Sequence, residues 1–407
     1  MENVYFARRE KLAALLPEDD GALIFSGEEI PLGVDMMYPF HVDKNFYYLT
    51  GLDMPGAAVY IARGGSLLFL PPYSPKREAY EGPQETTEQL CARAGFDVSA
   101  HREALPPERI LDSLPRMGTL HLDLQRPPVD CFAAPARRLA AVAAERGLST
   151  ENVYRKIYKL RSVKDSGEIS RIRRAVDITG ESLSYMAKNC RAGMYEYEWQ
   201  AAFEYNMRRH GCDTSFTSIV ASGKNAVYLH YEKNNAIVNN GELFLFDVGV
   251  YYDHYASDIS RTYPVGGVFT KRQREIYELV YDATRLVLDK MKPHRPYRDH
   301  VDALTDYFGK YVIPLHIVDT EIEKENFLRS LSRGCCHHLG LDAHDAYAEL
   351  DDELLPGMVF TNEPGVYLKN EGIGVRIEED LLITEDGNEL LSCDIPAAPD
   401  DILDLLN

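Results

Sequence analysis

Short apolar runs separated by turn residues dominate the first third of the chain. Four of them have the length and the flanking glycines or prolines of β-strands, at 21–27, 56–65, 66–72 and 119–124. An alanine- and leucine-rich helical pattern follows at 133–146. Interleaved strands and helices predict an α/β domain over residues 1–155.

A charged linker at 151–165 follows, for which we expect a strand and a turn. Asp165 and Glu168 then have the spacing of a capping box, in which two free N–H groups at a helix start are satisfied by side chains. Apolar residues next recur at helical intervals. This pattern predicts one helix at about 166–190 and a second at about 196–209.

The pattern predicts that one order of elements occurs twice in the C-terminal domain, residues 156–407. Two helices lead to a histidine-containing loop and then to a strand pair with two acidic residues. In the second copy, the helices are expected at about 272–291 and 298–310. The two halves share a pattern and little identity, so this is a pseudo-repeat. Two hairpins packed face to face would bring four carboxylates to a seam, which is a common place for a pocket.

The densest chemistry lies in RGCCHHLGLDAHD, residues 333–345. It precedes two strand-like segments that end in acids, and two more acids stand about a hundred residues earlier; the four are Asp247, Asp258, Glu363 and Glu378. A carboxylate at the end of a buried strand is costly unless it is paired or metal-bound. One such acid would be explained by a salt bridge or a turn cap. Four beside a histidine cluster favour a metal centre with two ions that share bridging carboxylates.

Two such ions can lower the pKa of a shared water and polarise a carbonyl, which points to hydrolysis of an amide. The chain has no GxSxG elbow and no cysteine in papain-like surroundings. Carboxylate-rich sites accept Mn²⁺, Co²⁺, Zn²⁺ or Fe²⁺.

Composition excludes several partners and compartments. A net charge of −20 argues against nucleic acids and anionic membranes. We find no signal peptide and no apolar run near the ~18 residues of a spanning helix, and therefore expect a cytoplasmic protein. Seven cysteines without a CxxC pair fit reduced thiols. Cys335 and Cys336, beside the histidines, are interpreted as buried residues and not as ligands.

The segments LFLFDVG, SDISRTYPV, HHLGLDAHD, TNEPGVY and GVRIEED resemble, in this order, the pita-bread metallopeptidases: aminopeptidase P, prolidase, methionine aminopeptidase and creatinase. The resemblance covers about 153–384 and implies a five-ligand centre. By this resemblance one metal would be bound by Asp247, both would be bridged by Asp258 and Glu378, and the second would be completed by His337 and Glu363.

The same resemblance implies further roles and a manganese cofactor. Glu363 would act as the general base for the bridging water or hydroxide. His230 and His344 would bind the substrate carbonyl and stabilise the tetrahedral species. Arg376 would orient Glu378 from the same strand face.

The segments at 38–61 and 76–82 resemble the creatinase-like N-terminal domain of aminopeptidase P and prolidase, which methionine aminopeptidases lack. This implies a homodimer or homotetramer in which Asp35 and Tyr80 reach a partner's active site; alternatively, both are ordinary surface residues. Proline-specific members carry a histidine where this chain has Arg333. A fixed cation there could change the substrate preference, or it points outward and His338 takes its place.

The sequence therefore predicts a dinuclear metal-dependent Xaa-Pro aminopeptidase acting on the N-termini of proline-containing peptides. An Xaa-Pro dipeptidase (prolidase) is the alternative within the family, because a basic residue poised for a free carboxylate, such as Arg333 or Arg376, would favour dipeptides. A non-catalytic interaction protein on the same fold is the alternative from another class. Loss of metal ligands would mark it, and this chain retains all five.

Overall fold

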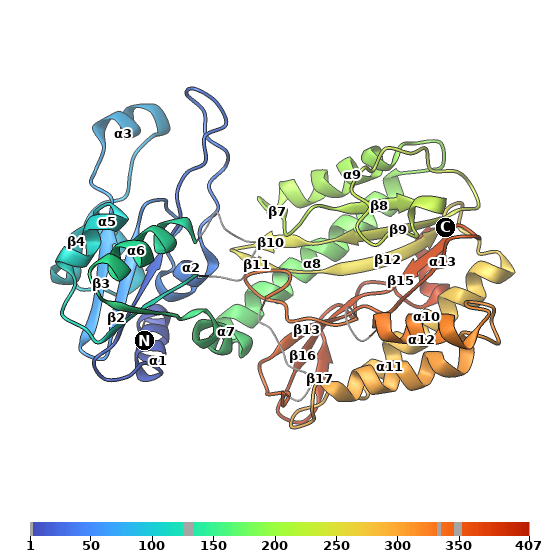
Figure 1. The fold of residues 1–407 in the computed structure, drawn as a ribbon. Coiled ribbons are helices and arrows are strands. Elements are labelled where there is room, and N and C mark those ends of the chain that lie inside the picture. The colour runs from blue at the N-terminus through green and yellow to red at the C-terminus, as the bar shows by residue number, and fades with distance from the viewer. Residues whose placement is uncertain (1–2, 125–132, 332–334, 346–351, 407) are drawn as a thin grey trace. The chain divides into compact units, whose positions relative to one another are not determined.

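The computed structural model describes residues 3–406 except 125–132, 332–334 and 346–351. The chain forms two compact units, Met1–Arg161 and Ser162–Asn407. Figure 1 shows each unit as strands covered by helices. In the described ranges, no helix combines the length and the apolar composition needed to cross a bilayer.

The first unit is built on a six-stranded sheet with the order β4-β3-β2-β1-β5-β6. Strands β1, β2 and β3 are antiparallel, whereas β5 runs parallel to β1, β6 to β5 and β4 to β3. The strands are β1 Gly21–Phe25, β2 Ala58–Ala62, β3 Gly65–Leu70, β4 His101–Glu103, β5 Thr119–Leu122 and β6 Ser149–Asn152. The helices are α1 Val4–Ala14, α2 Lys44–Thr50, α3 Pro75–Glu81, α4 Thr87–Ala94, α5 Pro107–Ile110, α6 Ala134–Glu145 and α7 Tyr154–Ser162, with 3-10 turns η1 Val98–Ala100 and η2 Leu111–Ser113.

The predicted strands and the helix at 133–146 are present, and side chains from both, including Leu23 and Leu139, share one core. The segment 151–165 differs from the expected strand and turn, since β6 ends at Asn152 and helix α7 follows. The many charged residues of this segment masked its helical pattern in the sequence, although Ile157 on the helix is fully buried.

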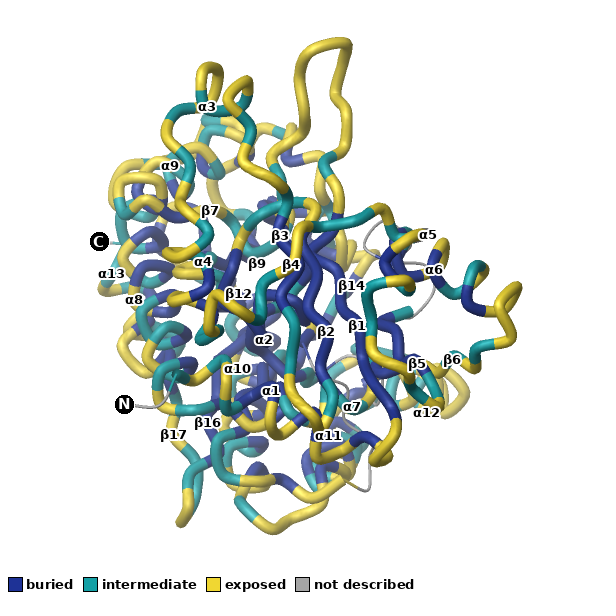
Figure 2. Tube along the Cα trace, turned by 90° about the vertical axis from the view of Figure 1, so that its left-hand side faces the viewer, coloured by how far each residue is buried: buried dark blue, intermediate teal, exposed yellow. Residues whose placement is uncertain are grey.

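An exposed apolar loop leaves the first unit between β1 and α2, and we call residues 28–38 the apolar arm. Its two sides are joined by hydrogen bonds from Leu32 N–H to Met36 O (2.9 Å) and from Tyr38 N–H to Ile30 O (2.9 Å). The exposed large side chains on the arm are those of Ile30, Leu32, Val34, Met36, Met37 and Tyr38. In Figure 2 most of this loop is exposed, and Glu29 near its base is intermediate.

The second unit holds four small sheets, with the orders β11-β10-β7, β12-β9-β8, β13-β16-β17 and β14-β15. The strands are β7 Asp213–Thr214, β8 Ile219–Ser222, β9 Leu243–Val248, β10 Val250–Tyr252, β11 Tyr255–Ala256, β12 Ile259–Pro264, β13 Val359–Asn362, β14 Gly365–Leu368, β15 Ile373–Arg376, β16 Glu379–Ile383 and β17 Asn388–Leu390. The helices are α8 Ser166–Asn189, α9 Glu196–Arg209, α10 Lys271–Leu288, α11 Arg298–Tyr311, α12 Glu321–Leu331 and α13 Pro399–Leu406, with a 3-10 turn η3 at Gly223–Asn225.

Helix pairs α8–α9 and α10–α11 match the predicted pseudo-repeat, and the capping box at Asp165 is formed. In the colour order of Figure 1, each pair precedes a group of strands. Helix α12 was not expected. The second strand group also differs from one simple hairpin, since β13 pairs with β16 while β14 and β15 pair with each other.

Candidate metal centre

A cavity of about 780 Å³ opens in the second unit, and eight of the predicted site residues line it. They come from five strand ends and two loops: Asp247, Asp258, Glu363, Arg376, Glu378, His230, His337 and His344. Arg333 lies outside the described residues. Asp35 and Tyr80 belong to the first unit, where both are exposed. The structure thus brings the second-unit candidates together.

Three side chains form the centre of this group. Ligand atoms of Asp258, His337 and Glu378 all lie within 4.8 Å of one another. Asp258, between β11 and β12, is held by a hydrogen bond from its N–H to Asp380 Oδ2 (3.1 Å). Glu378, between β15 and β16, donates its N–H to Ser260 O (3.0 Å). The two bridging candidates are therefore fixed by the backbone as well as by burial.

The imidazole of His337 is oriented by its neighbour. Its Nδ1 lies 3.1 Å from the carbonyl oxygen of His338, which can only accept, so Nδ1 carries the proton. In the neutral ring, Nε2 then has a free lone pair. This atom lies 3.3 Å from Glu363 Oε1 and 3.6 Å from Asp258 Oδ2. A metal ligand with its other nitrogen held by a carbonyl is the usual arrangement in metal sites.

Asp247 has one oxygen engaged and one available. Its Oδ2 forms an ion pair with Arg376, whereas its buried Oδ1 has no hydrogen-bond partner among the described residues. Arg376 also donates from Nε to Ser260 Oγ (2.7 Å) and from Nη1 to Tyr367 OH (3.1 Å). Its guanidinium therefore binds Asp247 directly and reaches Glu378 through the Ser260 hydroxyl, which donates to Glu378 Oε2 (2.7 Å).

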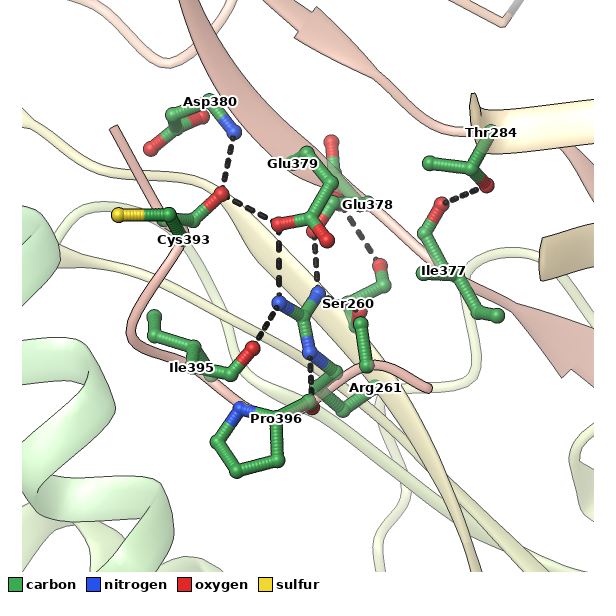
Figure 3. Close-up of polar contacts among 12 residues, drawn as sticks. Ser260, Arg261, Thr284, Ile377, Glu378, Glu379, Asp380, Cys393, Ile395 and Pro396 are labelled. Carbon is green, nitrogen blue, oxygen red and sulfur yellow. Dashed lines mark hydrogen bonds and ion pairs between the residues drawn. The ribbon is translucent and has the colours of Figure 1, made fainter. Parts of the chain in front are cut away.

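A second arginine supports the backbone of Glu378, as Figure 3 shows. Arg261 is fully buried and donates from Nη1 to Glu378 O (2.6 Å) and from Nη2 to Glu379 Oε2 (2.9 Å). It also donates from Nε to Pro396 O (2.8 Å). A buried charge with this many acceptors holds its partners in one geometry.

Carboxyl groups outnumber lysine and arginine side chains among the described residues that line the cavity. Burial raises the pKa of Asp258 and of Glu378 well above the ordinary range, and neighbouring carboxylates raise it further. Burial also opposes ionisation of Glu363, but the hydrogen bond and charge of His337 outweigh it and lower the pKa of Glu363. Of the described residues lining the cavity, Arg376 is the one lysine or arginine. Divalent cations fit this oxygen-rich set and its free Asp247 Oδ1.

The other two histidines lie on the cavity wall. The ring of His344 is 4.0 Å from that of His337, centroid to centroid, and neither His344 nor His230 belongs to the three-residue cluster. Partial desolvation and the neighbouring His337 lower the pKa of His344. A neutral imidazole there can donate one hydrogen bond into the cavity. Burial raises the pKa of the Cys335 thiol to about 12 and raises that of the Cys336 thiol well above its ordinary value, which disfavours the thiolate form that binds metals.

Ser260, Tyr367 and Arg261 were not predicted from the sequence. A signal for Ser260 does exist, because Asp258 and Ser260 are two residues apart and therefore share one face of an extended segment. Tyr367 and Arg261 resemble ordinary strand residues, and only the paired strands bring them to the carboxylates.

Two family models match this chain. The model of metallopeptidase family M24 covers residues 170–385, and that of the aminopeptidase P N-terminal domain covers residues 5–114. The Xaa-Pro aminopeptidase of Haemophilus influenzae is 32% identical over 424 residues, spanning 98% of this chain and 96% of the relative. Xaa-Pro aminopeptidase 3 of Mus musculus is 31% identical over 98% of this chain and 84% of its own.

Solved structures give the same result. The low-pH form of aminopeptidase P from E. coli superimposes with a TM-score of 0.87 at 27% identity, over 100% of this chain and 98% of that one. This confirms the predicted fold class, with an N-terminal creatinase-like domain and a C-terminal pita-bread domain. A cavity with all five ligand-type residues, on a fold shared from end to end, leaves one conclusion: the chain belongs to metallopeptidase family M24 and carries the N-terminal domain of aminopeptidase P.

Proposed function

We propose that this metallopeptidase is an Xaa-Pro aminopeptidase, which removes the N-terminal residue from peptides with proline in second position. One observation carries the proposal. Five ligand-type side chains line one cavity in a chain that matches Xaa-Pro aminopeptidases over nearly its whole length.

In this proposal two divalent ions, Mn²⁺ in the first instance and Co²⁺, Zn²⁺ or Fe²⁺ as alternatives, are held by five residues. Asp247 would hold one of them, His337 and Glu363 would hold the other, and Asp258 and Glu378 would be shared by both. When bound, the ions activate a water and polarise the scissile carbonyl. As an ionised carboxylate beside the ions, Glu363 would accept a proton from that water.

His230 and His344 are proposed to donate hydrogen bonds to the substrate carbonyl oxygen as negative charge develops on it. Arg376 is proposed as the residue that keeps Asp247 and, through Ser260, Glu378 in place. Its engagement also bears on the prolidase alternative. A guanidinium that is buried and bound to Asp247, Ser260 and Tyr367 is not free to receive a dipeptide's carboxylate. This observation favours longer peptides as substrates.

We further propose a cytoplasmic homodimer or homotetramer. The six large apolar side chains of the apolar arm are costly to expose and suit burial against a second copy of the chain. Asp35 on the arm and Tyr80 on α3 are the candidates for reaching a partner's cavity. Arg333 remains the candidate for altering proline preference.

The proposal is tested by comparing kcat/KM for three matched peptides with Mn²⁺ present: Xaa-Pro-Yaa, Xaa-Pro and Xaa-Ala-Yaa. We expect the first to be the best substrate, and the alanine peptide to be poorer by at least about tenfold, or roughly 1.4 kcal/mol. A preference for the dipeptide would establish the prolidase alternative. Equal rates on the proline and alanine peptides would refute proline specificity.

A further inference from the structure

Glu196, the first residue of α9, is a fully buried acid outside the metal centre. It forms no ion pair with a basic side chain in the described part of the chain. Its carboxylate instead accepts five hydrogen bonds. A buried charge without a counter-ion is costly unless it is saturated with donors, so this arrangement calls for an explanation.

All five donors come from one segment, residues 222–236. Oε1 accepts from the N–H of Ser222 (2.7 Å), from its hydroxyl (2.8 Å) and from Asn225 Nδ2 (3.0 Å). Oε2 accepts from Tyr231 OH (2.9 Å) and from Ala236 N–H (2.8 Å). One carboxylate thus joins the beginning, the middle and the end of this segment. Its place at the N-terminus of a 14-residue helix also favours negative charge.

The segment carries His230 between its anchored points. Leu229, His230 and Glu232 line the metal cavity, whereas the intervening Tyr231 turns back to Glu196 and packs against the apolar cluster that includes Ile219. The bond between Tyr231 and Glu196 therefore fixes the backbone next to His230, and with it the position of His230.

A second anchor supports this segment. Asn234 has a left-handed backbone (φ 44°) and a buried side chain. Its Oδ1 accepts from Val220 N–H (3.0 Å) and its Nδ2 donates to Ser218 O (2.8 Å). The segment is thus fixed on both sides of His230, and Glu196 supplies most of the bonds.

We propose that Glu196 is a positioning residue, which holds the segment 222–236 so that His230 meets the substrate carbonyl. It contacts no predicted metal ligand, and it acts only through His230. This inference rests on the proposed function, because it requires the role given there to His230.

The test is a double-mutant cycle on Xaa-Pro-Yaa hydrolysis. Glu196→Gln keeps the size of the side chain but replaces one acceptor oxygen by a donor. We expect kcat to fall between about tenfold and a hundredfold, bounded by the roughly hundredfold loss for His230→Ala. KM and metal content should stay near their normal values. If Glu196 acts through His230, the double variant should be no worse than His230→Ala alone.

Glu278→Gln, at an exposed position on α10, is the matched control and should leave kcat unchanged, because Glu278 accepts a bond from Arg274 on the same helix and none from the segment 222–236 in the described structure. Tyr231→Phe removes one of the five donors and should give a smaller loss, again non-additive with His230→Ala. If Glu196→Gln does not fold, Tyr231→Phe takes its place in the double-mutant cycle. Additive losses, unchanged kcat in both variants, or loss of metal would overturn the inference.

Hydrogen exchange distinguishes a wrong positioning role for Glu196 from a wrong proposed function. Glu196→Gln should raise amide exchange in 222–236 and not in 337–345. Protection that stays unchanged in 222–236 would overturn the positioning role whatever the enzyme cleaves. A wild-type protein inactive on Xaa-Pro peptides would instead refute the proposed function.

Discussion

Lys164 Nζ and Asp345 Oδ2 form an ion pair at 3.1 Å in which each side chain is 1% exposed. The pair lies against the histidine loop, since a Cβ on Gly340 would come within 2.2 Å of the Asp345 carboxylate. The N–H of Asp345 donates to His338 O (2.9 Å), the same carbonyl that receives His337 Nδ1–H. A buried pair outside the proposed ligand set therefore shares a hydrogen-bond acceptor with the ligand candidate His337.

Breaking this pair should destabilise the protein and weaken metal binding. Lys164→Met leaves a buried carboxylate without its cation, which typically costs about 3–5 kcal/mol. We expect that loss in the free energy of unfolding of the metal-free protein, measured with urea. Lys164→Met/Asp345→Asn should recover part of it. A single variant as stable as the wild type would mean that other partners satisfy Asp345.

Metal binding should depend on the bridging carboxylates. Asp258→Ala removes a ligand shared by both proposed ions, so most bound metal and nearly all activity should be lost. Metal content per chain, measured by mass spectrometry, checks this. Glu325→Ala, on an exposed part of α12, serves as the control. Two metals per chain and normal turnover in Asp258→Ala would remove Asp258 from the bridging position.

His344 should act on the substrate without binding metal. Because the proposal places His344 at the substrate carbonyl and not among the five ligands, His344→Ala should lower kcat by about a hundredfold, as for loss of one oxyanion donor, with metal content near normal. Metal content and kcat are measured on the same preparation. Loss of metal in this variant would place His344 among the ligands.

Metal affinity should rise with pH. Burial and neighbouring acids raise the pKa of Asp258 and Glu378 well above the ordinary value of about 4, so the metal-free folded protein binds protons that metal must displace. Each proton released should make affinity about tenfold stronger per pH unit in this window. Calorimetric titration in buffers of different ionisation enthalpy counts the protons. A pH-independent affinity would contradict the prediction.

The same raised pKa values determine how the stability of the metal-free protein changes with pH. The folded state holds these protons more tightly than the unfolded state does. The contribution of these two groups to stability is therefore fully present below about pH 4 and is lost as pH rises toward their folded pKa values. Thermal melts of metal-free protein at several pH values, compared with Asp258→Asn, measure this trend.

The sequence predicts the candidate ligands because each is an acid or a histidine next to an apolar strand, where burial is evident and no partner is near in the chain. It predicts the helix pairs because their apolar spacing is regular. Arg376 shows what the sequence could not predict, namely which strands lie next to one another. Its strand face suggested Glu378 as the partner, and the structure adds the direct bond to Asp247, which lies on a different strand. Glu196 is a second example. In the sequence EYEWQ it resembles a solvated acid, because its hydrogen-bond donors lie 26 to 40 residues away along the chain.

Arg261 has a consequence for how the enzyme is made. It joins the backbone of Glu378 to the carbonyls of Ile395 and Pro396. Synthesis proceeds from the N-terminus, so these contacts cannot form until residue 396 has been added. The buried Arg261 therefore acquires three of its backbone acceptors only after the strand group that carries Glu378 and the segment that follows it have both been synthesised.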